Sequence, residues 1–286
     1  MSAADEAAVV WSVAEALARA RAAGVDRLDA QLLLARVLAR PRSWLLAHGE
    51  ALLDADQVRW LQARLARHAD GEPLAYLLGE QEFHGLTLNV TADVLVPRPD
   101  TEVLVDWALE LLDGVLTGIE QPAVVDLGCG SGAIALAVKH AQPRAAVVGT
   151  DHSNAALAVA RANALRLGLD VGFAHGSWWG AVPAQRFHLA LANPPYIAAG
   201  DPHLPALRRE PAGALSPGGD GLDALRQIVQ GAAPHGVPGG WLLLEHGHDQ
   251  APAVQRLLHA AGFENVETRR DLGGRTRCTG GRSTRG

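Results

Sequence analysis

A glycine-rich loop at residues 128–132 is the first feature of the chain that could bind a ligand. It lies in the run VVDLGCGSGAIALAV, which reads as a strand, a tight turn and a helix. Glycines let the backbone turn sharply and let a ligand approach without a clash against a Cβ atom. The run matches neither GxGxxG nor GxxxxGK[ST], and Asp126 at the strand end places an anion beside the ligand. An anion there disfavours a pyrophosphate and favours a cationic amino acid group.

S-adenosylmethionine carries a sulfonium and an ammonium, and therefore suits this loop better than a nucleotide phosphate. The plainer alternative is a strand-to-helix turn with no ligand. On the ligand-binding interpretation, the candidate residues of the loop are Asp126, Gly128, Cys129, Gly130, Ser131 and Gly132.

Asp151 follows the next apolar run, AAVVGT, about twenty residues beyond the loop. A carboxylate at this place can accept hydrogen bonds from both hydroxyls of a ribose. The alternative is a helix N-cap, but Ser153 and Asn154 are better placed for that role. The spacing resembles the ligand-binding half of the class I methyltransferases.

The motif Asn193-Pro194-Pro195-Tyr196 ends a third apolar run and can be interpreted chemically. A planar NH2 group next to a π system is a poor nucleophile because its lone pair is delocalised. The Asn193 side-chain oxygen and the Pro194 carbonyl could accept its two N–H bonds, and the prolines would hold both acceptors in place. Tyr196 offers a flat face to the planar group, and methyl transfer is then driven by positioning. The alternative is a rigid turn; no general base is evident, so we expect the proton to leave to water.

The elements before residue 122 are expected to be mostly helical. Helical spacing of apolar residues covers the chain to about residue 70, and Asp54 with Gln57 has capping-box spacing. Residues 72–99 suggest short strands, such as a hairpin, and Asp100 is placed to cap a following helix.

After residue 122 strands and helices alternate, which predicts a doubly wound α/β sheet with ligands at the carboxyl ends of its strands. The expected strands are 123–127, 145–149, 187–192, 241–244 and 266–269, and the expected helices are 132–140, 154–167, 222–229 and 249–261. The Gly- and Arg-rich tail that holds Arg275, Arg277, Arg282 and Arg285 is expected to be a solvated end.

The hydrophobic content, net charge and cysteine count limit the kinds of protein that this chain can be. The chain of 286 residues is 48% hydrophobic with a formal net charge of -6, which is globular and weighs against binding through nucleic acid phosphates. Two cysteines give no disulfide framework, and neither a signal peptide nor a membrane span is evident. We therefore expect a soluble cytoplasmic protein. His246 and His248 lack further ligands for a metal site.

With these residues in hand, the chain resembles the peptide-chain-release-factor glutamine methyltransferases of the HemK/PrmC type. The most specific matches are GEPLAYLLGEQEFHGLTLNVTADVLVPRPDTE, residues 71–102, and LLLEHG, residues 242–247. The resemblance implies an N-terminal helical substrate-recognition domain (1–72), a hairpin linker (73–99) and a Rossmann-like class I methyltransferase domain (100–286).

The resemblance also implies further roles for residues at the site. Trp178 would pack on the adenine of the cofactor, and Asn193 would contribute to both cofactor and substrate binding. Arg98, Thr101 and Glu102 would lie beside the cofactor. Two departures stand out: Ser177 replaces an acid before the tryptophan, and Arg209 replaces an aromatic residue before Glu210-Pro211.

The implied reaction methylates the side-chain nitrogen (N5) of the glutamine in the Gly-Gly-Gln loop of release factors, with S-adenosylhomocysteine as the product. The partners would be these factors, without stable nucleic acid binding, and nothing in the sequence requires more than a monomer. One alternative is N6-adenine methylation of DNA or RNA, since adenine also carries a planar NH2; such an enzyme must unstack its base and should carry a basic groove. A non-catalytic cofactor-binding module is a second alternative, which the intact motifs disfavour.

Overall fold

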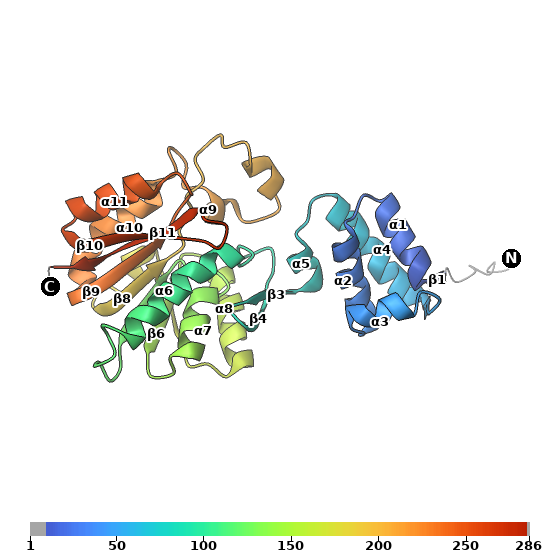
Figure 1. Cartoon of the computed structure of the whole chain (residues 1–286), viewed down its shortest axis with the longest axis horizontal. Coiled ribbons are helices and arrows are strands. Elements are labelled where there is room, and N and C mark those ends of the chain that lie inside the picture. The colour runs from blue at the N-terminus through green and yellow to red at the C-terminus, as the bar shows by residue number, and fades with distance from the viewer. Residues whose placement is uncertain (1–9, 285–286) are drawn as a thin grey trace. The chain divides into compact units, whose positions relative to one another are not determined.

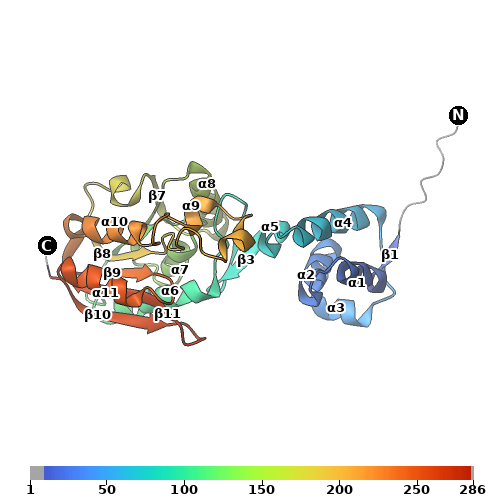
Figure 2. The same cartoon turned by 90° about the horizontal axis from the view of Figure 1, so that it is seen from above.

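The computed structural model describes residues 10–284 and divides into two compact units, with the division between Gly79 and Glu80. Figures 1 and 2 show the helical first unit and the α/β second unit from two directions. None of the described helices is long and apolar enough to cross a membrane. The elements of the first unit are β1 (Trp11–Ser12), α1 (Val13–Ala22), α2 (Arg27–Leu38), α3 (Arg42–Ala47), β2 (Leu52–Leu53), α4 (Ala55–Ala69) and α5 (Leu74–Leu78).

Three helices of the first unit, α1, α2 and α4, begin at a residue whose side chain caps the helix. The predicted capping box is present at α4, where the Gln57 amide donates to Asp54 Oδ1 at 2.8 Å and the Asp54 amide donates to Gln57 Oε1 at 2.9 Å. One apolar face of each helix turns inward to form the core of the unit. The fully buried side chains of this core are Val13, Ala16, Leu33, Leu34 and Leu53.

The second unit begins with a hairpin and continues as alternating strands and helices. Its elements are β3 (Glu80–Phe83), β4 (Leu86–Asn89), η1 (Pro99–Thr101), α6 (Glu102–Asp113), β5 (Ala123–Leu127), α7 (Ala133–Ala141), β6 (Ala146–Asp151), α8 (Asn154–Leu167), β7 (Gly172–His175), η2 (Trp178–Ala181), β8 (Phe187–Ala192), η3 (Leu204–Leu207), α9 (Ala212–Leu215), α10 (Asp223–Gly231), η4 (Ala233–His235), β9 (Gly236–Glu245), α11 (Ala251–Ala260), β10 (Phe263–Arg270) and β11 (Thr276–Ser283).

The second unit is organised by a seven-stranded sheet in the order β10-β11-β9-β8-β5-β6-β7. Strands β5 to β9 run parallel to one another, whereas β11 is antiparallel to both of its neighbours. Helices α6 and α7 cover one face, while α10 and α11 cover the other (Figure 1). The strands are apolar on both faces because both are buried. The predicted doubly wound α/β fold is confirmed.

The prediction of a solvated C-terminal tail was wrong for the described residues, while Arg285 lies outside them. Residues 276–283 form β11, which lies inside the sheet between β10 and β9 rather than in solvent. Its glycines serve packing, since a Cβ atom on Gly280 would lie 2.3 Å from Leu243 Cδ2 and 3.0 Å from Trp107 Cη2. A side chain there would therefore push apart the strand and helix that cover this position.

Three local expectations also need correction. Asp100 does not cap α6; the N-cap residue is Thr101, and Asp100 instead forms an ion pair with Arg277. The short strand β7 was not predicted, because its sequence GFAH lacks an apolar run. Residues 74–78 form helix α5, where the sequence suggested strands.

Candidate active site

The candidate site lies where the order of the strands reverses. Strand β5 is flanked by β6 on one side and by β8 on the other, so the chain moves outward from β5 and later returns beside it. Loops at the carboxyl ends of two such strands diverge and leave a crevice for a ligand. Here a cavity of about 240 Å³ is lined by both loops, with Gly128, Gly130 and Ser131 after β5 and Asn193 and Pro195 after β8.

The glycine loop is held in a fixed shape by its own backbone. Gly128 and Gly130 have φ angles of 80° and 54°, in the left-handed region where a Cβ atom is unfavourable. The amides of Gly128 and Cys129 both donate to the Thr150 carbonyl, each at 2.8 Å. The Cys129 thiol is buried, and burial raises its pKa well above the usual value, so it is poorly suited to act as a nucleophile.

Asp151 clamps this loop and faces the same cavity. Its Oδ2 accepts from the Gly130 amide at 2.9 Å, and its Oδ1 accepts from the Ser153 amide at 2.8 Å. The helix cap that the sequence offered as an alternative for Asp151 is supplied by Ser153, whose hydroxyl accepts from the Ala156 amide at 3.1 Å. Oδ1 also lies 3.5 Å from His152 Nδ1, so Oδ2, which accepts only from Gly130 among the described residues, keeps an acceptor position for a ligand.

Asp126 lies beneath the loop and is not part of the cavity wall. Its side chain is fully buried, with Oδ2 accepting from the Ala135 amide at 3.1 Å in the first turn of α7. Oδ1 has no hydrogen-bond partner among residues 10–284. Burial raises the pKa of this carboxyl to about 7, with a smaller contribution from Asp151, while the bond to Ala135 opposes the rise.

Trp178 forms the wall of the cavity above Gly128. A Cβ atom on Gly128 would lie 3.1 Å from Trp178 Cζ3, so the glycine makes room for the ring. The indole Nε1 donates to Gln227 Oε1 at 3.0 Å, and the Trp178 backbone has a φ of 46°. A positive φ at a bulky residue is an unusual conformation that marks a position fixed by its surroundings. Ser177 is not among the residues that line the cavity.

The Asn193–Tyr196 motif leaves the end of β8 and is tied to three other segments. Asn193 Nδ2 donates to the Thr101 hydroxyl at 3.2 Å, and the Tyr196 hydroxyl donates to Glu245 Oε1 at 3.2 Å. Gln250 Nε2 donates to the Tyr196 carbonyl at 2.9 Å. Because its ends and its side chains are all held, the motif presents a fixed set of hydrogen-bonding groups.

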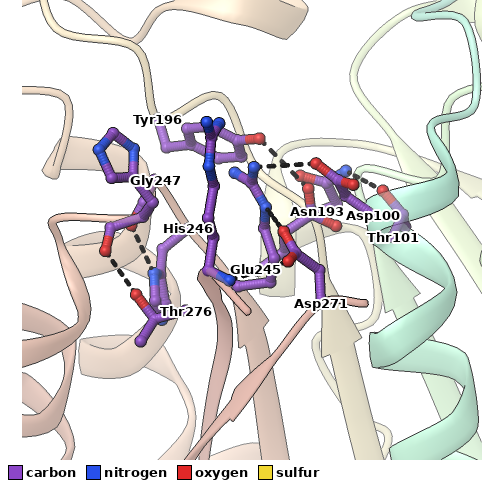
Figure 3. A network of polar contacts seen from close by, with 12 residues as sticks. Asp100, Thr101, Asn193, Tyr196, Glu245, His246, Gly247, Asp271 and Thr276 are labelled. Atoms are coloured by element: carbon purple, nitrogen blue, oxygen red, sulfur yellow. Dashed lines mark hydrogen bonds and ion pairs between the residues drawn. The ribbon is translucent and has the colours of Figure 1, made fainter. Parts of the chain in front are cut away.

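Glu245 joins the motif to a buried polar network at the carboxyl end of β9 (Figure 3). It is 1% exposed, and burial raises its pKa to about 7, whereas the Thr101 and Tyr196 hydroxyls and Arg277 lower it. Arg277 forms ion pairs with Asp271 and Asp100, each at 2.9 Å. Burial and Glu245 together raise the pKa of the Tyr196 phenol, so this phenol stays protonated and can donate.

The remaining residues of the PRPDTE segment hold the cavity wall together. Arg98 forms an ion pair with the buried Glu210, which also accepts from the Val96 amide at 3.2 Å. Glu102 accepts from the His84 amide at 3.0 Å and so fixes the turn of the β3–β4 hairpin. Of these residues, Arg98 and Thr101 line the cavity.

The cavity brings together most, but not all, of the candidate residues. Those that line it are Gly128, Cys129, Gly130, Ser131, Asp151, Trp178, Asn193 and Pro195. Those that do not are Asp126, Gly132, Pro194 and Tyr196. Sequence reasoning gave no role to Glu245, although an acid that directly ends an apolar strand run is a signal for a functional carboxylate.

Two protein-family models match the chain, one in each unit. A model described as the PrmC N-terminal domain matches residues 12–79, and the methyltransferase small domain matches residues 102–220. Two solved structures share the fold. The catalytic domain of hMettl16 has a TM-score of 0.56 and 15% identity, and the match covers 78% of this chain and 82% of that chain. A T. thermophilus 16S rRNA methyltransferase in complex with AdoMet and guanosine has a TM-score of 0.54 and 22% identity, and the match covers 71% of this chain and 49% of that chain. At these identities the likeness supports the fold alone.

Relatives of known function match almost from end to end. The chain is 48% identical to the release factor glutamine methyltransferase of Burkholderia pseudomallei over 92% of this chain and 94% of that protein. It is 50% identical to that of Bordetella pertussis over 90% and 95%, and 40% identical to that of Escherichia coli over 94% and 96%. These identities extend over both units, and the two family matches agree with them. The chain therefore belongs to the release factor glutamine methyltransferase family.

Proposed function

We propose that this protein methylates the N5 side-chain nitrogen of the glutamine in the Gly-Gly-Gln loop of peptide chain release factors, with S-adenosylmethionine as the methyl donor. The observation that carries the proposal is the position of Asn193-Pro194-Pro195-Tyr196 directly after the carboxyl end of β8, the neighbour of the strand that leads into the glycine loop. Membership of the family supplies the substrate class.

The residues of the cavity fit this cofactor. Gly128 makes room for the Trp178 ring, Gly130 leaves open space where a side chain would stand, and Asp151 Oδ2 keeps an acceptor position for a ribose hydroxyl. Asp126 lies beneath the loop and outside the cavity wall, so we assign it an indirect effect on a cationic ammonium, through its charge and not through a hydrogen bond. We assign the Trp178 ring to one face of the adenine. When bound, the cofactor supplies an electrophilic methyl group on a sulfonium and leaves as S-adenosylhomocysteine.

The chain contributes orientation to the reaction. We propose that Asn193 Oδ1 and the Pro194 carbonyl accept the two N–H bonds of the substrate amide, and that the Tyr196 ring packs on its plane. Acceptors that are already fixed need not reorganise as positive charge develops on the nitrogen. The nitrogen gains the methyl group and gives up one proton to solvent.

We propose that the N-terminal helical domain, predicted from the sequence at residues 1–72 and contained in the first unit, recognises the protein substrate. The reaction then takes place in the cytoplasm, where release factors act, and involves one copy of the chain and no stable nucleic acid complex. The formal net charge of -6 supports the last point.

The test is methyl transfer from labelled S-adenosylmethionine to purified release factors. Label should appear on the wild-type factor, disappear when the glutamine of its Gly-Gly-Gln loop is changed to alanine, and be absent from a duplex DNA control. Asn193→Ala should remove most turnover while calorimetry shows nearly unchanged cofactor affinity. Label on DNA, or none on the factors, would overturn the proposed substrate; wild-type kcat in Asn193→Ala would overturn the amide-positioning role.

A further inference from the structure

We propose that Glu245 is a positioning residue for methyl transfer, because its carboxylate holds the Tyr196 phenol and so fixes the ring that packs on the substrate amide. The proposal rests on the function proposed above, since the position of the ring matters for turnover only if the ring contacts the substrate. It goes beyond that function by giving a role to a buried carboxylate that does not line the cavity.

The ends of β8 and β9 place the two residues together. These strands are paired in parallel up to Ala192 and Leu244. Glu245 is the next residue on β9, and the Asn193–Tyr196 motif begins directly after β8. The Tyr196 hydroxyl donates to Glu245 Oε1 at 3.2 Å, and Figure 3 shows the phenol beside this carboxylate. The hydrogen bond therefore joins the far end of the ring to the neighbouring strand.

The backbone of Tyr196 is held by the segment that follows the same strand. Gln250 Nε2 donates to the Tyr196 carbonyl at 2.9 Å, while Gln250 Oε1 accepts from the Gly247 amide at 2.9 Å. Because a backbone amide can only donate, Gln250 must turn its oxygen toward Gly247 and its NH2 group toward Tyr196. Gln250 thus fixes the main chain of Tyr196 and Glu245 fixes its hydroxyl, so the ring between these two points has little freedom to swing.

The bond to Tyr196 gives a reason for a carboxylate at this buried position. Glu245 is 1% exposed, and its Oε2 has no hydrogen-bond partner within the described part of the chain. The guanidinium of Arg277 forms its ion pairs with Asp271 and Asp100, each at 2.9 Å. A buried carboxylate with an unsatisfied oxygen lowers stability, and an apolar residue would avoid this cost. The hold on Tyr196 is a gain that an apolar residue could not provide.

A fixed ring is what the proposed transfer requires. The Tyr196 phenol stays protonated because burial and Glu245 raise its pKa, so it is always the donor in this pair. The ring also packs against the buried apolar cluster that contains Leu244. A phenylalanine could make the same packing contacts, but its ring would have no hydrogen bond to stop it from tilting. In transfers driven by positioning, a displacement of about 1 Å can lower the rate about 100-fold.

The decisive comparison is Glu245→Leu against Glu245→Gln. Leucine removes the acceptor, whereas glutamine keeps one oxygen for the phenol and places its NH2 group where Oε2 has no partner. With cofactor and release factor at saturating concentration, Glu245→Leu should lower kcat by about 10- to 100-fold. Glu245→Gln should lower it by only about 3- to 10-fold, because a neutral acceptor keeps about half the strength of a charged one. Calorimetry should give the same cofactor affinity for all three proteins, since Glu245 does not line the cavity.

A double-mutant cycle separates positioning from simple structural support. Tyr196→Phe removes the same hydrogen bond from the other partner and should lower kcat as much as Glu245→Leu does. The variant that carries both changes should be no slower than either single variant, because one bond can be lost only once. A general loosening of the fold would instead multiply the two effects. If Glu245→Leu does not fold, Glu245→Gln takes its place in the cycle, and its effect on kcat should vanish in the Tyr196→Phe background.

The bond itself can be observed without any substrate. The chain has two tyrosines, Tyr76 and Tyr196, so a tyrosine label with ¹³C at Cζ gives a single NMR signal from Tyr196 in a Tyr76→Phe background. Glu245→Leu should shift this signal toward that of a phenol in water, and Glu245→Gln should shift it less.

Three results would overturn the proposal: wild-type kcat in Glu245→Leu, effects of Glu245→Leu and Tyr196→Phe that multiply, or a loss in Glu245→Gln as large as in Glu245→Leu. The last result would mean that the charge of Glu245 acts on the reaction and not its hold on the ring. Failure of the proposed function gives a different result, because the wild-type enzyme would then not label the release factor while the Tyr196 signal still responds to Glu245→Leu.

Discussion

The contact between the glycine loop and Trp178 can be tested by adding one methyl group. Gly128→Ala places a Cβ atom 3.1 Å from Trp178 Cζ3 in a backbone with φ of 80°. Gly130→Ala is a matched control in the same loop, because its φ is 54° but no atom of residues 10–284 lies within 4 Å of the added Cβ. Both changes strain the backbone, and only the first disturbs the tryptophan.

The expected magnitudes follow from these two differences. An alanine in the left-handed region lowers the free energy of unfolding by about 1–2 kcal/mol. Alanine also has less conformational entropy than glycine in the unfolded chain, and this effect raises the free energy of unfolding by about 0.4–1 kcal/mol. Gly130→Ala should therefore lower the free energy of unfolding by about 1 kcal/mol. Gly128→Ala should cost about 1–3 kcal/mol more, because the ring must shift while its Nε1 is held by Gln227.

Urea unfolding of the ligand-free proteins measures these costs, and the same pair of changes in a Trp178→Ala background completes a double-mutant cycle. The excess cost of Gly128→Ala should disappear when the ring is absent. Equal costs for the two glycine changes in the wild-type background, or an excess that survives in Trp178→Ala, would refute the packing argument. Calorimetry should also show weaker cofactor binding for Gly128→Ala than for wild type.

Three further predictions concern the cofactor loop and the first unit. Asp151→Ala should weaken S-adenosylmethionine binding by about 10- to 100-fold, since a ribose acceptor and the clamp on Gly130 are both lost; unchanged affinity in calorimetry would argue against the ribose role. Asp126→Asn should raise the free energy of unfolding at pH 8 by about 1–2 kcal/mol because a buried charge is removed. This gain should shrink steadily as the pH falls from about 7 and should vanish only near 3.8, the ordinary pKa of an aspartate, because between these values the folded carboxyl is neutral while the unfolded one is ionised; an equal gain at pH 8 and pH 4 would contradict the assignment. Deletion of residues 1–79 should leave cofactor affinity intact and lower kcat/KM on release factors at least about tenfold, the effect of a lost docking contact; normal kcat/KM would exclude substrate recognition by this unit.

Much of the second unit could be predicted from local sequence. Strand β5, helix α8 and strand β8 have the predicted bounds, because each is a continuous apolar or periodic run with a clear start. Ser153 and Asn154 were preferred to Asp151 as the cap of α8, and the cap is Ser153. These signals lie within one element and need no knowledge of its neighbours.

The errors occur where distant residues decide the structure. Strand β11 is rich in glycine, threonine and arginine, a composition typical of solvated ends. Gly280 is nevertheless needed for packing, because a Cβ atom there would clash with Leu243 and Trp107. Asp100 has the ordinary features of a helix cap, but Arg277 of β11 takes its carboxylate. Because β11 itself was missed, the network around Glu245 could not be predicted.

The adjacency of β5 and β8 has a mechanical consequence. Backbone hydrogen bonds join the two strands over Val124–Asp126 and Leu189–Leu191, immediately before the loops that border the cavity. Neighbouring strands in a sheet are spaced about 4.8 Å apart. Thermal displacement of one strand therefore carries the other with it, and the separation between the two loops should fluctuate less than the position of either loop. The sheet thus keeps the distance between the cofactor loop and the substrate motif nearly constant, even when thermal motion moves the whole unit.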